Sequence, residues 1–151
     1  MLRTVLAVAL ATALLATALP VVDSARTTHA ERTVENELRH LDSAATRLAD
    51  ASDPVPRDAP GARREHAVVL PQASWGTAPL AALRVPPPGS DEAISYRVTG
   101  GNWTTFHTRS PVPVVGPPGG LTLRDGGRHR LVLTFQRRAG RAVVVVRRPD
   151  V

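Results

Sequence analysis

An uncharged apolar run near the start of the chain constrains its fold more than any other feature. After Arg3 and Thr4, residues 5–22 run for 18 positions without a charged side chain. As an α-helix, which rises ~1.5 Å per residue, this run would be roughly 27 Å long, just short of a ~30 Å hydrocarbon core. We therefore expect residues 1–22 to form a transmembrane anchor or a signal segment.

Three interpretations of this segment differ in what happens to it. A signal peptide would have a basic start, the apolar run, and small-residue cleavage positions after Ala18 or Ser24. An uncleaved anchor would keep Arg3 in the cytoplasm and export the rest of the chain. A buried core helix is disfavoured, because the run begins at residue 5 behind a single Arg. We favour the anchor, which makes the chain a single-pass cell-membrane protein with an extracytoplasmic C-terminal domain.

Residues 23–52 carry the pattern of an amphipathic helix that continues from the apolar run. No Gly or Pro lies between Asp23 and Asp50, and Pro54 stops the helix, because the residue before a proline avoids helical geometry. We expect Pro20 to kink the helix without ending it. One apolar stripe recurs at spacings of four, three, four and three, formed by Val34, Leu38, Leu41, Ala45 and Leu48.

The rest of the chain predicts a Pro-rich linker over residues 53–61 and a β-rich domain over residues 62–151. Turns are expected at Gly100-Gly101 and at Asp125-Gly126-Gly127, and loops over residues 86–89 and 111–120. The fold class is therefore α+β, a long N-terminal helix followed by a small antiparallel sheet or sandwich. The predicted strands cover residues 64–70, 93–98, 103–108, 121–124, 128–136 and 142–146.

Composition limits what stabilises this domain. The chain has no cysteine and only 3% aromatic residues, so its core must be built from Val, Leu and Ala without disulfides. Alternation along residues 128–136 turns Leu131, Leu133 and Phe135 inward and places Arg128 and Arg130 on the opposite face. We expect the inward set to pack against alternate residues of 142–146.

No constellation in the sequence resembles an active site. The five histidines lie far apart, without metal-ligand spacing, and there is no Gly-x-Ser-x-Gly elbow. None of the paired glycines opens a helix in the way that phosphate binding requires. We therefore expect a protein that is not an enzyme and that uses no cofactor and no metal.

Charge is unevenly distributed along the chain, and all 19 basic residues are Arg. Residues 23–60 carry a net charge of −3, whereas residues 119–151 carry a net charge of +6. The basic segment is either a solvated face or a surface that docks on the acidic helix or on an acidic partner; nucleic acid is disfavoured, because stacking aromatics are few. The candidate partner-binding residues are Arg128, Arg130, Arg137, Arg138 and Arg141.

One short motif allows covalent modification. Asn102-Trp103-Thr104 is an Asn-x-Thr acceptor sequence on the side of the membrane where glycosylation would occur. The alternative is a turn Asn followed by a strand Trp, and a Trp at the middle position makes a poor acceptor. Asn102 is thus a candidate glycosylation site.

The order of these segments is similar to the layout of type IV pilins and pseudopilins, in which an apolar helix leads into an amphipathic helix and a sheet. Two features depart from that pattern: the sequence shows no processing leader ahead of the apolar run and no Glu near its start. Nearly the whole chain also resembles an uncharacterised family of short membrane-anchored proteins from halophilic archaea. The stretches that carry this second resemblance are residues 5–10, the helix after Asp23, residues 60–64 and residues 70–79.

These observations together predict a function class. We expect a non-enzymatic, membrane-anchored structural or interaction component of a cell-envelope assembly, associated with pilus or secretion machinery. The alternative is a cleaved, secreted domain that binds an anionic envelope polymer through its Arg-rich face. The expected partners are the membrane and envelope or secretion-machinery proteins, and no nucleic acid.

Overall fold

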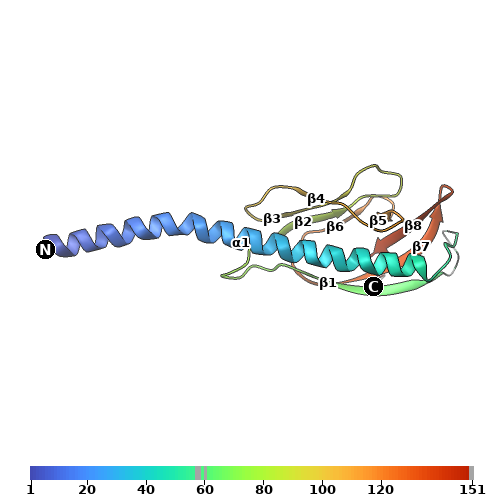
Figure 1. Ribbon diagram of the computed structural model, residues 1–151, viewed down its shortest axis with the longest axis horizontal. Helices are drawn as coiled ribbons and strands as arrows, with labels where there is room; N and C mark the ends of the chain where they lie inside the picture. Colours follow the sequence, from blue (N-terminus) through green and yellow to red (C-terminus); the bar gives the residue numbers. More distant parts are fainter. Residues whose placement is uncertain (57–58, 60, 150–151) are drawn as a thin grey trace.

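One long helix leads into a domain made of two small sheets (Figure 1). The computed structural model describes residues 1–56, 59 and 61–149. The helix, α1, runs from Leu2 to Asp50, and only its second half lies against the strands. The strands are β1 (Arg63–Leu70), β2 (Leu80–Val85), β3 (Ile94–Val98), β4 (Thr104–Phe106), β5 (Val114–Val115), β6 (Leu121–Leu123), β7 (Gly127–Arg138) and β8 (Arg141–Arg147).

Helix α1 confirms that the apolar run and the amphipathic segment form one continuous element. Pro20 lies inside the helix and does not end it, and the axis is gently bowed (Figure 1). The helix ends at Asp50, shortly before Pro54, as expected from the restriction that a proline places on the residue before it. All five residues of the predicted stripe are buried, together with Ala30, Asp42 and Ala44.

The strands form two four-stranded sheets. Sheet I has the order β1-β7-β8-β5, and sheet II has the order β4-β3-β2-β6. All pairings are antiparallel except that of β5 with β8, which is parallel. The α+β fold class with a small, mostly antiparallel β domain is thus confirmed.

The helix and both sheets share one hydrophobic core. Leu38 and Leu41 of α1 belong to the same cluster as Leu83 of β2 and Leu133 of β7. The predicted inward set, Leu131, Leu133 and Phe135, packs in this core with Val144 and Val146 of β8. The prediction for the core is therefore confirmed, and α1 supplies one wall of it.

Strand β8 lies between β7 and β5 and is buried on both faces, with Val144 and Val146 in the main core. Val143 and Val145 point away from the helix and form a second, small cluster with Val115 of β5. The hairpin between β7 and β8 has a two-residue turn, Ala139-Gly140, in which both residues have positive φ. This is the backbone conformation that two-residue hairpins favour, and it occurs here with an Ala at the first position.

Two strands lie where the sequence predicted none, and one predicted turn joins strands of different sheets. Strand β2 was not predicted, and β5 lies inside the predicted loop 111–120. The turn Asp125-Gly126-Gly127 joins β6 of sheet II to β7 of sheet I, so it carries the chain between the sheets. Gly126 is required there, because a Cβ atom at this position would lie 2.2 Å from the Pro71 carbonyl oxygen.

The segment predicted to be a linker begins alongside sheet I. The Val55 amide donates to the Phe135 carbonyl oxygen at 3.4 Å, and the Arg137 amide donates to the Val55 carbonyl oxygen at 2.8 Å. The start of this segment is therefore paired with β7. Residues 57, 58 and 60 of the predicted linker lie outside the described residues.

Candidate functional site

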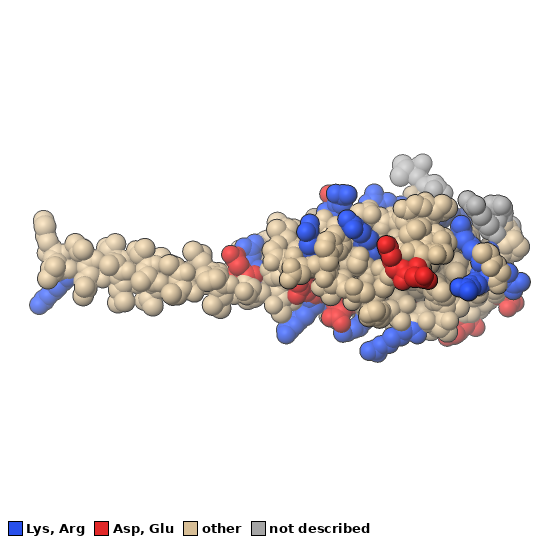
Figure 2. Space-filling model, turned by 90° about the horizontal axis from the view of Figure 1, so that it is seen from above, with Lys and Arg blue, Asp and Glu red and all other residues tan. Residues whose placement is uncertain are grey.

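The side chains of the first half of α1 are exposed, and we call this half of the helix bare. Every residue from Met1 to Ala25 is exposed, and the first buried side chain of the helix is Ala30. Leu10 and Leu14 are 63% and 61% exposed, values that a soluble core helix would not show. In the space-filling view the projecting rod carries basic atoms only near its free end (Figure 2). By length and composition, this part of the helix is suited to cross a membrane.

The second half of α1 is held to the sheets by carboxylates that the sequence did not single out. Asp42 is 7% exposed, and its two oxygens accept hydrogen bonds from the amides of Arg109 (2.8 Å) and Ser110 (3.2 Å). These bonds fix the loop between β4 and β5 onto the helix. Asp42 directly follows Leu41 of the apolar stripe. An acidic residue at the edge of that stripe was the only sequence pattern that pointed to a buried role for Asp42.

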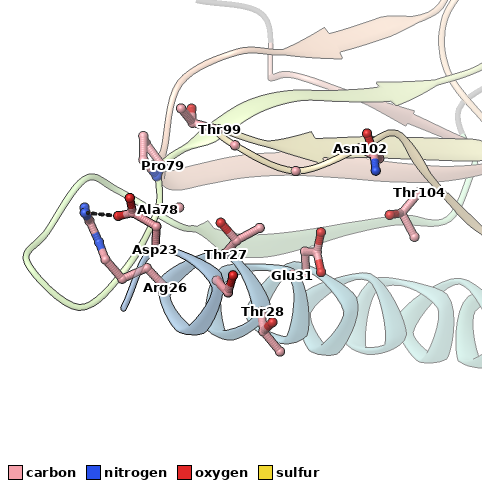
Figure 3. A pocket seen from close by; sticks show the side chains of 13 residues that line it. Asp23, Arg26, Thr27, Thr28, Glu31, Ala78, Pro79, Thr99, Asn102 and Thr104 are labelled. Carbon is pink, nitrogen blue, oxygen red and sulfur yellow. Dashed lines mark ion pairs between the residues drawn. The ribbon is translucent and has the colours of Figure 1, made fainter. Parts of the chain in front are cut away.

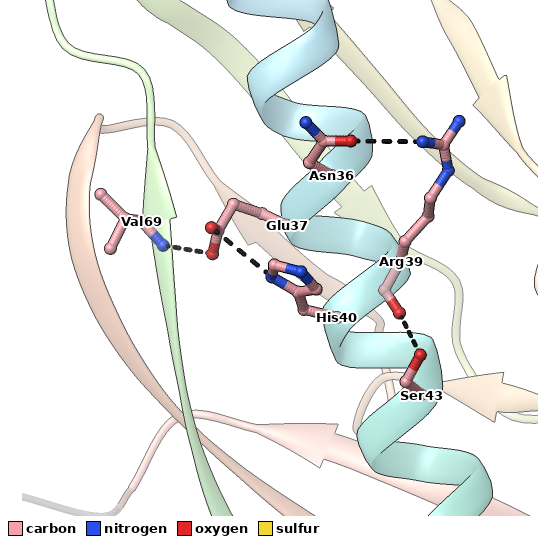
Figure 4. A network of polar contacts seen from close by, with 6 residues as sticks. All are labelled: Asn36, Glu37, Arg39, His40, Ser43 and Val69. Atoms are coloured by element: carbon pink, nitrogen blue, oxygen red, sulfur yellow. Dashed lines mark hydrogen bonds and ion pairs between the residues drawn. The ribbon is translucent and has the colours of Figure 1, made fainter.

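Glu37 makes the matching contact on the other side of the helix. Its Oε2 accepts a hydrogen bond from the amide of Val69 in the edge strand β1 at 2.9 Å, and its Oε1 lies 4.0 Å from His40 (Figure 4). The helix thus occupies one donor on an open sheet edge, which protects that edge from pairing with another chain.

A shallow cleft of about 720 Å³ opens where the helix enters the domain. It lies between residues 23–31 of α1 and the turn that joins β3 to β4 (Figure 3). The turn approaches the helix so closely that a Cβ on Gly101 would lie 2.9 Å from Glu31 Oε1. Asn102 lies in this lining and is exposed, so the candidate acceptor is accessible.

Trp103, the middle residue of the acceptor sequence, is held by two cations. The Arg84 guanidinium lies 4.3 Å from the ring centroid and that of Arg97 lies 5.3 Å from it. Trp103 is 41% exposed and precedes β4, so it lies in the turn rather than in the predicted strand. The cation–π contacts with Arg84 and Arg97 explain the exposure of this large aromatic side chain, and no bound ligand is needed to account for it.

The strand register places most of the candidate Arg residues on one face of sheet I. Paired residues share a face, and faces alternate along each strand. Arg128 and Arg130 of β7 therefore lie on the face away from the helix, and so do Arg138 and its hairpin partner Arg141. We call this the basic face. The register adds Arg63 of β1, opposite Thr134, and Arg147 of β8, opposite Val132.

The basic face differs from the predicted set at one position. Arg137 pairs with Ala142 and belongs to the opposite face, because it lies one residue from Arg138 on the same strand. Arg128, Arg130 and Arg141 are exposed, and Arg138 is half-buried. Within the described part of the chain, Arg63, Arg128, Arg130 and Arg141 form no salt bridge. Their charge is therefore available to an external anion.

Two titratable groups are perturbed where the helix meets the sheets. Burial lowers the pKa of His66 on β1 below its ordinary value of 6.5, and the nearby Glu37 carboxylate opposes this. Burial also raises the pKa of Tyr96 above 10.0, and Glu35 and Glu31 act in the same direction. Neither residue was singled out from the sequence. Over the described ranges, no group of three His, Asp or Glu side chains is arranged to hold a metal ion.

The chain matches one known family over residues 1–149, described as Domain of unknown function (DUF7311). It belongs to this family. The match covers the bare half of α1 as well as the β domain, so the apolar helix is part of what the family shares. Membership in an uncharacterised family agrees with that part of the sequence-based prediction. Comparison with curated proteins and with solved structures found no match to either.

Proposed function

We propose that this chain is a non-enzymatic, membrane-anchored structural or interaction component of a cell-envelope assembly. One observation carries the proposal: a single uninterrupted helix is bare and apolar in its first half and forms a core wall in its second half. A bare apolar helix of this length is stable in lipid, where its backbone groups are satisfied internally. The domain is then held at the membrane without a flexible connection.

The orientation follows from charge. Arg3 is the basic residue ahead of the apolar run, and the positive-inside rule keeps it in the cytoplasm. The β domain is then extracytoplasmic. The helix-then-sheet layout supports a pilus- or secretion-associated role, and we extend the proposal to an origin among halophilic archaea on the resemblance of residues 60–64 and 70–79.

Replacing Leu14 and Leu15 together with Arg tests the anchor. Each charge near the centre of a spanning helix costs ~2.5–3.5 kcal/mol on insertion scales, so we expect loss of the protein from the membrane fraction or a block in export. Both residues are exposed, so the domain itself should fold as before. The matched control replaces the same two residues with Ala and should stay in the membrane.

Fractionation of the two variants decides the outcome. A double-Arg variant that remains in the membrane fraction as fully as the double-Ala variant would show that the apolar half of α1 is not the anchor. Mass spectrometry of the mature N-terminus adds the second criterion. A chain that still begins at Met1 or Leu2 has kept its helix.

The basic face favours a second candidate function, a cleaved and secreted domain that binds an anionic envelope polymer. Arg forms planar, bidentate contacts with carboxylate and phosphate groups. We expect Arg130→Gln with Arg141→Gln to weaken binding to an immobilised polyanion, and high salt to weaken it further, since the Debye length is ~8 Å at 0.15 M.

A control with the same loss of charge separates the basic face from net charge. Arg32 and Arg47 are exposed on α1, which packs against the face of sheet I opposite the basic face, so replacing both with Gln should leave polyanion binding nearly unchanged. Equal losses in the two double variants would mean that net charge alone attracts the polymer. A mature chain cleaved after Ala18 or Ser24 would favour this candidate over the anchored one.

A further inference from the structure

The loop between β1 and β2, residues 71–79, reaches farther toward the N-terminal end of the molecule than the rest of the domain (Figure 1). Its tip is a tight turn closed by two hydrogen bonds, from the Ser74 amide to the Thr77 carbonyl oxygen (3.1 Å) and from the Thr77 amide to the Ser74 carbonyl oxygen (3.4 Å). Trp75 lies at this tip and is 93% exposed. A rigid turn thus presents a whole indole to its surroundings.

Two hydrogen bonds fix the loop to the helix at one position along the helix axis. Arg26 Nη2 donates to the Ser74 carbonyl oxygen at 2.8 Å, and the Ala78 amide donates to the Arg26 carbonyl oxygen at 3.4 Å. Asp23 holds the same guanidinium at 3.5 Å, the ion pair drawn in Figure 3. The position of the tip along α1 is therefore set by residues 23–26, which directly follow Val22, the last residue of the uncharged run 5–22.

This position along the helix axis corresponds to the surface of a bilayer that the apolar run would span. Arg26 lies four residues beyond Val22, which is ~6 Å along a helix at ~1.5 Å per residue. A bilayer of ~40–45 Å with a ~30 Å core leaves ~5–8 Å of headgroup region on each side. The turn that carries Trp75 therefore lies at headgroup depth.

We propose that the Ser74–Thr77 turn is a second membrane contact, in which the Trp75 indole inserts among lipid headgroups beside the helix. Trp is enriched at this depth in membrane proteins, because its ring is apolar and its N–H can bond to the polar region. The inference rests on the proposed membrane anchoring. With two contacts instead of one, the domain is held against rotation about the helix axis.

Fluorescence of the full-length chain in vesicles of phosphatidylcholine and phosphatidylglycerol tests this contact. The chain has two Trp residues, so Trp103→Phe leaves Trp75 as the only reporter and Trp75→Phe leaves Trp103. We expect the Trp103→Phe protein to shift its emission to shorter wavelength on reconstitution and to be quenched by lipids brominated near the headgroup. The Trp75→Phe protein, whose remaining indole is in contact with two Arg side chains, should show neither change.

Flotation of the same samples separates this inference from the anchor. Protein that floats with the vesicles while Trp75 keeps the emission of a water-exposed indole overturns the loop contact and leaves the anchor standing. Protein that does not float overturns both. Shielding of Trp75 that requires added envelope proteins, and is not produced by pure lipid, also overturns the loop contact, because the occupant would then be a protein.

Discussion

The two halves of α1 have the same backbone conformation and opposite surroundings. Leu10 in the first half is 63% exposed, and Leu38 in the second half is 1% exposed. In the second half, burial against the sheets stabilises the helix, as is usual in water. The first half has no such cover. One continuous helix thus has two surroundings: residues 5–22 are apolar and exposed, whereas the stripe within residues 30–48 packs in the protein core.

The polar residues of the two halves differ in the same way. The first half has no charged side chain between Arg3 and Asp23, and its Thr12 and Thr17 hydroxyls donate to carbonyl oxygens of the helix itself. In the second half, Glu37 and Asp42 bond to backbone amides of the β domain. Docking of the helix is therefore specified by polar contacts as well as by the stripe.

The largest expected difference between the halves comes from removing a leucine in each. We expect Leu38→Ala to lower the free energy of unfolding of the β domain by about 2–5 kcal/mol, because it leaves a cavity in the core. Leu10→Ala removes the same atoms from an exposed position and should leave that free energy unchanged. Denaturant unfolding of both full-length variants in mild detergent measures the two values, and equal losses would contradict the division of the helix.

An intermediate effect is expected at Asp42. Asp42→Ala leaves two amides of the loop between β4 and β5 without their acceptor, at about 1–3 kcal/mol for each unsatisfied group. Asp42→Asn retains one acceptor oxygen and should lose less. Asp23, whose side chain is 74% exposed on the same helix, provides the control, and Asp23→Ala should barely change the melting temperature. The docking role of Asp42 would be wrong if the two Ala variants melted alike.

The smallest expected effect is a dependence of the folding stability on pH, and it arises where the second half of α1 packs against the sheets. The pKa of His66 in the folded state lies below its unfolded value of 6.5, so the unfolded state takes up the proton first as pH falls. The stability associated with neutral His66 is complete above that unfolded value and decreases as pH falls from it toward the folded pKa. Glu37, His40, Arg47 and Arg64 contribute the surrounding charges.

Unfolding measured from about pH 8 to about pH 5 should show this loss in the wild type. His66→Gln should flatten the curve in that range. His29→Gln should not, because His29 is exposed on the helix and is not among the groups that surround His66. A wild-type curve identical to that of His66→Gln would mean that this histidine does not report on docking.

The helix was predictable because each of its signals is local. An uncharged run, a stripe with helical spacing and a proline after the end are all read within one segment. Strand β2 was missed because Leu80–Val85 is rich in Leu and Ala and does not alternate, and its place between β3 and β6 comes from pairing with other segments of the chain. Strand β5 has two residues among prolines, and only its parallel pairing with β8 defines it.

The basic face was predictable only in part, for a related reason. Alternation along β7 placed Arg128 and Arg130 together, since that pattern lies within one strand. Arg63 joins them through the pairing of β1 with β7, which no local signal reveals. The same limit applies to Trp75. It lies in the stretch that resembles a known family, but its position beside Arg26 depends on the fold.

The continuity of α1 has a mechanical consequence. Since 49 helical residues run without interruption from Leu2 to Asp50, a pulling force on the β domain would be transmitted along the helix to its exposed N-terminal half. The tension acts parallel to the stripe, so it loads the whole helix–sheet contact in shear and does not peel it residue by residue. The β domain thus behaves as the rigid head of a lever, and any tilt of the exposed half of α1 would turn the domain through the same angle.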